Sequence, residues 1–206
     1  MCANYRPMAP NRAYLIHFPE PEDLHFKDDL YPLSDTPLVF AAAHHLEWRL
    51  VKFGMIPKWA KDLKIGRKTY NARTETVHEK PSFRNAWYRS QFALIPVETI
   101  YEPRYVEGKA QRWGIYRQDS LPYTVAAIYE NAIIDGQHIR SMSLLTINAE
   151  QHPIMKHFHK PGDEKRSIIV IPEQDREEWL HCHFEDAPKF FLNLNPQEFT
   201  SSYMPR

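Results

Sequence analysis

The chain has 206 residues, of which 43% are hydrophobic, and its 26 Lys and Arg residues balance 26 Asp and Glu residues. This length supports one substantial core, whereas two halves would each be marginal, so we predict a single domain over residues 1–206. A net charge of zero excludes a uniformly basic surface, so any site for nucleic acid must come from local segregation of charge. Two distant cysteines exclude a disulfide framework, and no apolar run is long enough for a membrane span.

Short strand-like runs separated by prolines dominate the chain, which has 17 prolines and only six glycines. Their content of β-branched and aromatic residues predicts a mainly β core with a few helices, an α+β fold. Helices are expected at about 81–89 and 172–182, and irregular structure up to about residue 36. The segment 193–206 has the polar composition of a peripheral tail. The predicted strands are 38–43, 46–53, 92–95, 112–116, 124–129, 139–146 and 167–171.

The first chemical feature is Cys2, which directly follows Met1. Removal of Met1 would leave an amine and a thiol on one residue, with ordinary pKa values of about 7.7–8.0 and 8.5. Such a 1,2-aminothiol condenses with an aldehyde, first to an imine and then to a thiazolidine ring, without a cofactor. Position alone favours an ordinary second residue that has no chemical role.

A turn at 54–59 and the segment 71–76 suggest a site for an anion. Trp59 stands in the turn, where it either stacks on a base or anchors the core. Asn71 and Arg73 combine a carboxamide with a guanidinium, a pair that can hold a phosphate and orient a reacting group. Arg73 alternatively pairs with a carboxylate such as Glu75. Three cations precede this segment, at Lys64, Arg67 and Lys68.

Two further segments carry groups for proton transfer. Glu102 comes just past an apolar strand and beside Tyr101, so it is either a proton donor with a raised pKa or a solvated acid. His157 and His159 stand one residue apart before a strand, and either could supply an acid–base imidazole. No second cluster with matching spacing accompanies them, so we expect no bound metal.

Taken together and in order, these segments resemble the SRAP family, the "SOS-response-associated peptidase" domains that attach covalently to abasic sites in single-stranded DNA. The resemblance covers nearly the whole chain. It rests on Met1-Cys2, the turn 54–59, 71–76 in the form N-A-R-x-E-T, the strand 94–96 leading to Tyr101-Glu102, and His159 ahead of Arg166 and an Ile/Val strand.

The resemblance implies a barrel-like or strongly twisted antiparallel sheet and assigns a role to each catalytic candidate. Cys2 would be the nucleophile, Asn71 would orient it, Glu102 would promote opening of the deoxyribose, and His159 would assist proton transfer. The DNA contacts would be Arg73 and Trp59, and we add a cationic path made of Lys64, Arg67, Lys68 and Arg84.

The implied protein is a DNA-damage response protein that acts as a monomer on abasic single-stranded DNA. Abasic-site lyase cleavage is an expected side activity. We expect no metal, no small-molecule cofactor and no membrane. The expected location is the cytoplasm, on the nucleoid when bound to DNA, in a bacterium, or the nucleus in a eukaryote.

Three departures from the family pattern concern the surroundings of the nucleophile. Ala3-Asn4 follow Cys2 where the family usually has Gly-Arg, and Pro103 stands where tryptophan is common. An insertion-like segment, 160–165, separates His159 from Arg166, so His157 remains a possible substitute for His159. We expect these changes to affect DNA affinity and substrate preference more than the nucleophile.

Two other functions share the same residues. An N-terminal cysteine can also cleave amides with its own amine as the base, in which case Asn71 would help to form an oxyanion hole and the protein would be a self-processing peptidase. In a passive single-strand binding module, Cys2 would have no role. The acidic stretch 20–29, which includes Asp28 and Asp29, is expected to lie away from DNA because it would repel phosphates.

Overall fold

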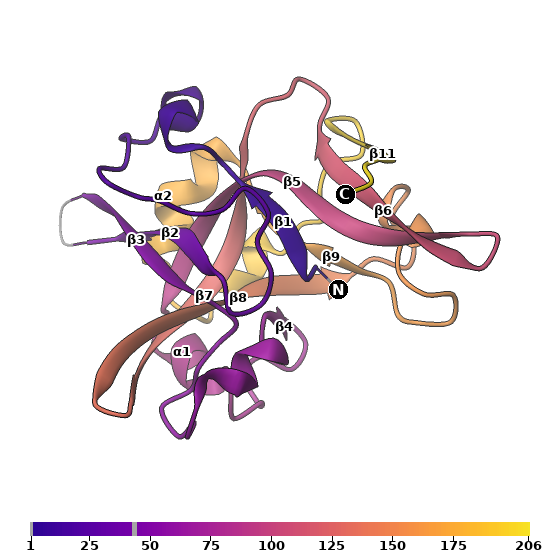
Figure 1. Ribbon diagram of the computed structural model, residues 1–206. Helices are drawn as coiled ribbons and strands as arrows, with labels where there is room; N and C mark the ends of the chain where they lie inside the picture. The colour runs from indigo at the N-terminus through magenta and orange to yellow at the C-terminus, as the bar shows by residue number, and fades with distance from the viewer. Residues whose placement is uncertain (1, 43–44) are drawn as a thin grey trace.

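The computed structural model describes residues 2–42 and 45–206. Within these residues, eleven strands form one sheet, and short helices pack against it (Figure 1). The strands are β1 Asn4–Pro7, β2 Asp35–Ala41, β3 Leu46–Phe53, β4 Asn71–Arg73, β5 Phe92–Val106, β6 Lys109–Arg117, β7 Tyr123–Ile134, β8 Gln137–Asn148, β9 Arg166–Ile168, β10 Val170–Ile171 and β11 Phe199–Tyr203. The helices are α1 Arg84–Tyr88 and α2 Arg176–His181, with 3₁₀ turns η1 Pro10–Ile16, η2 Leu63–Arg67, η3 Met155–His157, η4 Glu173–Asp175 and η5 Ala187–Phe190.

Five of the strands close into a ring. The pairings run β7–β8–β3–β2–β5, and β5 then pairs with β7, which returns the sheet to its start. Closure confirms the barrel-like, mainly β fold with few helices. The sheet is mixed, however, because β8 runs parallel to both β3 and β4. The expected antiparallel sheet thus also contains parallel pairings, at β8.

Strand β5 explains how the core is divided. Its apolar run alternates between two hydrophobic clusters, with Phe92 and Leu94 in one and Ala93 and Ile95 in the other. Successive side chains of a strand point to opposite faces, so a continuous apolar run is buried on both sides. Helix α2 covers the first face, where Trp179 is fully buried and its Nε1 donates to the Ala93 carbonyl at 3.0 Å.

The predicted elements are present, but several have different limits. The prediction 46–53 coincides with β3, and 167–171 is split between β9 and β10. The predicted strand 38–43 corresponds to β2, with Ala43 outside the described residues. The strand predicted at 92–95 continues to Val106, so Glu102 lies within β5 and not beyond its end. Proline at positions 96 and 103 does not stop this strand.

Both ends of the chain contain strands that the sequence analysis did not predict. β1 lies along β5, with Asn4 opposite Tyr101. β11 pairs with β6 in an antiparallel ladder, and Phe199 is buried against Tyr123 with a ring-centroid distance of 4.9 Å. The expectation of a peripheral tail over 193–206 was therefore wrong for β11, because two large apolar side chains, Leu194 and Phe199, are buried there.

No helix in the described part of the chain has the length and apolar character needed to span a bilayer.

Candidate active site

The pairing of β1 with β5 brings the N-terminal strand alongside β5 (Figure 1). Cys2 directly precedes β1, and its side chain is packed in the core with an exposed fraction of only 2%. Because Asn4 is opposite Tyr101, the antiparallel ladder places Cys2 near the segment of β5 that contains Glu102. Glu102 is also buried, and its charge acts on the Cys2 thiol.

Asn71 holds the backbone of Cys2. It begins β4, whose parallel pairing with β8 sets Asn71 opposite Leu144. Its Nδ2 donates to the Cys2 carbonyl at 2.9 Å. Its Oδ1 is buried and accepts no hydrogen bond within the described residues. An unsatisfied buried acceptor is costly, so this oxygen is a ready partner for a donor group brought by a ligand.

His159 is brought to Glu102 by the loop that follows η3. Its Nε2 lies 3.1 Å from Glu102 Oε2, and both side chains are buried. Its backbone N–H donates to the Pro103 carbonyl at 2.8 Å, and its φ of 65° lies in the left-handed region, which is uncommon for a residue other than glycine. His157 is exposed on η3, so the geometry favours His159 over His157 as the acid–base partner of Glu102.

Burial and charge both keep the Cys2 thiol protonated. Loss of hydration raises the pKa of Cys2 strongly, and the negative charge of Glu102 raises it further. The pKa of half-buried Tyr70 is raised by the same two causes, desolvation first and Glu102 second. The resting site therefore holds a neutral thiol beside a carboxylate, in contrast to the pre-formed thiolate of a reactive cysteine.

This environment predicts slow alkylation of Cys2. In a Cys182→Ala background at pH 8, we expect iodoacetamide to modify folded protein at less than about a tenth of the rate of urea-unfolded protein. Because the folded pKa is raised above the unfolded value, the folded rate should keep rising with pH after that of the unfolded chain has levelled off. Equal rates in the two states across pH 7–10 would contradict a buried, protonated thiol.

Arg73 is half exposed and makes an ion pair, but not with the predicted partner. Its Nη1 lies 2.9 Å from Glu164 Oε2, and 47% of its side chain is exposed. Glu75 instead accepts two hydrogen bonds from buried Arg166, at 2.9 and 2.8 Å. The suggested pairing of Arg73 with Glu75 was therefore wrong, because Arg166 takes both Glu75 oxygens.

Trp59 is exposed, at 56% of its surface, and does not anchor the core. Its Nε1 donates to the Pro81 carbonyl at 3.2 Å, which places it in an open cavity of about 470 Å³ with Arg84 on the lining. The turn is held by close contact between Gly54 and Gly66: a Cβ on Gly54, which has φ +112°, would lie 2.1 Å from the Gly66 carbonyl oxygen.

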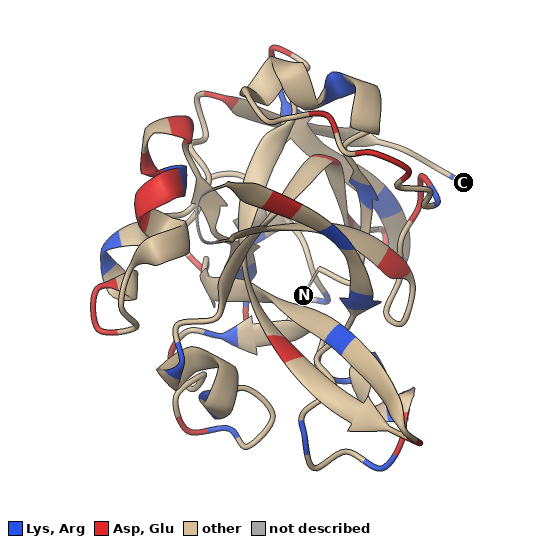
Figure 2. Cartoon of the chain, turned by 90° about the vertical axis from the view of Figure 1, so that its left-hand side faces the viewer, with Lys and Arg blue, Asp and Glu red and all other residues tan. Residues whose placement is uncertain are grey.

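The predicted cationic residues on and near η2 and α1 are all exposed, and within residues 2–42 and 45–206 none of the four is in an ion pair. They are Lys64, Arg67, Lys68 and Arg84. Acidic and basic segments are interspersed along the ribbon in Figure 2, in line with the net charge of zero.

Two residues near Cys2 were not found from the sequence. Arg112 of β6 donates from Nε to Asn4 Oδ1 at 3.0 Å and stacks over Tyr101, with its Cζ 3.3 Å from the ring centroid. Asp29 pairs with Arg112 at 2.9 Å and accepts a hydrogen bond from Asn4. Asp29, from the acidic stretch expected to lie away from DNA, thus contacts the strand that follows Cys2, and Arg112 balances its charge. Only the β5–β6 ladder, with Arg112 opposite Pro103, brings these groups together.

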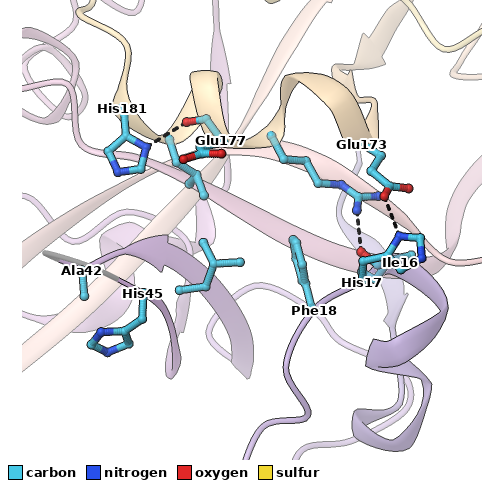
Figure 3. Close-up of a pocket in the computed structure, with 11 residues that line it drawn as sticks. Ile16, His17, Phe18, Ala42, His45, Glu173, Glu177 and His181 are labelled. Carbon is cyan, nitrogen blue, oxygen red and sulfur yellow. Dashed lines mark hydrogen bonds and ion pairs between the residues drawn. The ribbon is translucent and has the colours of Figure 1, made fainter.

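A separate cavity of about 500 Å³ lies between η1, β3 and α2, and Figure 3 shows its lining. His17 pairs with Glu173 there, and Arg176 donates to the Ile16 carbonyl at 2.6 Å. None of the predicted catalytic or DNA-contacting residues lines this cavity.

Within the described ranges, no group of three or more His, Cys, Asp or Glu side chains is arranged to hold a metal ion.

Known proteins resemble this chain in both sequence and structure. "Abasic site processing protein YoaM" of Bacillus subtilis is 31% identical over 157 residues, which are 75% of this chain and 62% of YoaM. "Abasic site processing protein YedK" of Escherichia coli is 26% identical over 149 residues, 72% of this chain and 62% of YedK. The matched part thus spans less than two thirds of the length of these relatives.

A crystal structure of a protein from Bordetella bronchiseptica superposes with a TM-score of 0.92 at 28% identity, covering 100% of both chains. One from Bacteroides thetaiotaomicron has a TM-score of 0.82 at 17% identity, covering 100% of this chain and 93% of the other, and shows the shared fold. The sequence model described as "SOS response associated peptidase (SRAP)" matches residues 1–204. With the fold and these relatives, that match shows that the chain belongs to the SRAP family.

Proposed function

We propose that this protein captures abasic sites in single-stranded DNA by forming a covalent thiazolidine through Cys2 after removal of Met1. Removal of Met1, which lies outside the described residues, is part of the proposal. The observation that carries it is the convergence of four side chains from separate parts of the chain: Cys2, Asn71, Glu102 and His159. The names of the abasic-site-processing relatives support the choice of substrate.

Glu102 and His159 suit the first step. An abasic deoxyribose is mostly a closed hemiacetal, and opening it requires proton transfer at the ring oxygen and at the anomeric hydroxyl. A carboxyl group and an imidazole held 3.1 Å apart can share a proton and pass it in either direction. The buried setting strengthens their interaction and excludes bulk water. The product of this step is the free aldehyde.

The two nucleophiles of Cys2 then act in sequence. The amine adds to the aldehyde and water is lost, which gives an iminium ion. The positive iminium favours the thiolate and so offsets the effect of Glu102 on the pKa of Cys2. Sulfur adds to the imine carbon, the thiol proton is released, and a five-membered ring closes. Attack within one residue has a high effective concentration.

Asn71 and the exposed cations serve binding and orientation. The hydrogen bond from Asn71 to the Cys2 carbonyl fixes the direction of the nucleophile, and its free Oδ1 can accept from the opened sugar. Arg73, Trp59 and the four exposed cations would hold the strand through phosphate contacts and base stacking. An imine that sulfur does not capture can lose the 3′ phosphate by β-elimination, which would appear as abasic-site lyase activity.

An amide-cleaving function is less well supported by the same geometry. A peptidase needs donors directed at a substrate oxyanion, at hydrogen-bond distance. Asn71, the side chain suggested for this role, directs Nδ2 at the carbonyl of Cys2 itself. The neutral, buried thiol also lacks the activation that amide attack requires.

The direct test is a covalent band shift. Processed protein, with its free N-terminal cysteine verified by mass spectrometry, is incubated with a single-stranded oligonucleotide that carries one abasic site, and the products are separated under denaturing conditions. We expect a shifted band with the intact protein and none with Cys2→Ala, because that variant lacks sulfur. A shift that persists in Cys2→Ala, or turnover of amides without any shift, would contradict the proposal.

A further inference from the structure

The insertion-like segment 160–165 forms the wall of a cavity beside His159. This cavity has a volume of about 340 Å³, and its lining joins the candidate catalytic histidine to the arginine proposed to contact DNA. The lining residues are Arg73, His159, Gly162, Asp163, Glu164 and Arg166.

Glu164 uses both of its carboxylate oxygens inside this cavity. Oε2 lies 2.9 Å from Arg73 Nη1, and Oε1 lies 2.7 Å from Arg166 Nη1. Asn148 also donates to Oε1, at 3.3 Å. One carboxylate thus bridges two guanidinium groups, an arrangement that the two non-bridging oxygens of a phosphodiester can also adopt.

The two arginines differ in how firmly they are held. Arg166 is buried and donates to Glu75 and to the Thr146 carbonyl as well as to Glu164. Arg73 is half exposed, and Glu164 is its ion-pair partner. A phosphate that binds Arg73 Nη1 at the position of the Glu164 carboxylate must therefore displace this carboxylate.

The side chain of Glu164 can leave this position at little cost. The side chain of Glu164 is 34% exposed, and the segment turns at Gly162, which has φ +85° and open space around it. Hydrogen bonding from Arg166 lowers the pKa of Glu164, so the carboxylate stays charged at neutral pH. A partly exposed ion pair of this kind is worth little, so a polyanion can replace it.

We propose that Glu164 is an internal competitor for the phosphate-binding position on Arg73, so that a DNA strand gains this contact only by expelling Glu164. The inference rests on the proposed function, because it assumes that a DNA phosphate approaches Arg73. Under this inference, the segment 160–165 helps to set the affinity for DNA. The DNA strand must make enough other contacts to offset the loss of the ion pair between Arg73 and Glu164.

The test measures binding of a fluorescent, undamaged single-stranded oligonucleotide, which has no aldehyde and cannot be trapped. At low salt we expect Glu164→Gln to bind about three- to fivefold more tightly than the unsubstituted protein, the range set by the loss of one exposed competing pair. Glutamine keeps an oxygen that accepts from Arg166, and thermal unfolding checks that the variant is folded. The gain should shrink as salt screens the pair.

Asp163→Asn is the matched control. Asp163 lines the same cavity and carries the same charge, but within the described residues its side chain makes no ion pair or hydrogen bond. We expect its affinity to change less than about 1.5-fold, since only a screened, long-range charge is removed. In an Arg73→Gln background, Glu164→Gln should no longer increase affinity.

Equal gains from Asp163→Asn and Glu164→Gln would overturn the inference, as would a gain that persists without Arg73 or no gain at all. These outcomes are separate from failure of the proposed function, which would appear as absence of the covalent shift with abasic DNA while binding of the undamaged strand still responds to Glu164→Gln.

Discussion

Replacement of Cys2 by serine is expected to abolish the stable DNA adduct while preserving the first chemical step. Serine keeps the α-amine, so an imine can still form, but its hydroxyl is a much weaker nucleophile than sulfur. We expect the heat-stable shifted band to fall below about 1% of the wild-type yield, because ring closure is lost. Borohydride, which reduces an imine, should restore a shifted band.

The same variant should cleave the strand more than the wild-type protein does. An imine that is not captured has time to undergo β-elimination, so cleaved oligonucleotide should accumulate on the denaturing gel. Cys182→Ser is the matched control because Cys182 is buried elsewhere, with its thiol directed to the Trp179 carbonyl, and it should leave the adduct unchanged. A stable band from Cys2→Ser at the wild-type rate would disprove capture by sulfur.

Glu102→Gln is expected to slow adduct formation by about 10²–10⁴-fold, the usual contribution of a positioned general acid or base. Glutamine has nearly the same shape, but its amide cannot exchange a proton with the sugar or with His159. The measurement is the single-turnover rate of adduct formation on an abasic oligonucleotide. Binding of the undamaged oligonucleotide should change little, because the side chain of Glu102 is buried.

Two controls separate a chemical role of Glu102 from a structural one. Glu98→Gln makes the same change four residues earlier on β5, where Glu98 pairs with Arg12 at 2.6 Å, and it should leave the rate within about twofold. In Glu102→Gln, the alkylation profile of Cys2 should move to lower pH, because the neighbouring negative charge raises the pKa of Cys2. An unchanged rate of adduct formation combined with a shifted alkylation profile would leave Glu102 with an electrostatic effect but no role in ring opening.

Local sequence was sufficient to predict strands with continuous buried apolar residues, and the order of the motifs was sufficient to predict the family. The strand 46–53 was predicted at its observed limits, and the run that begins at Phe92 was recognised because both faces of β5 are buried and the apolar residues are continuous. The order of the motifs also led to the SRAP family, which the family match confirms. A motif preserves residue types and order, and these are readable without coordinates.

Strands that depend on pairing between distant segments could not be predicted from the local sequence. β1 and β11 are short and mostly polar, so their strand character comes from the ladders with β5 and β6 and not from local propensity. Prolines in β5 suggested an early end to this strand, yet Glu102 lies within it because the partner strands continue alongside. Contacts of high sequence separation leave no periodic signal in either partner.

For the candidate site, the sequence by itself determined the candidates: Cys2, Asn71, Glu102 and His159 were each selected from residue type and motif. Only the tertiary structure decided which groups meet. It joined Glu102 to His159 and not to His157, and it gave Arg73 the partner Glu164 in place of Glu75. The physical reason is that an ion pair depends on distance and burial, and these are properties of the folded sheet and its loops.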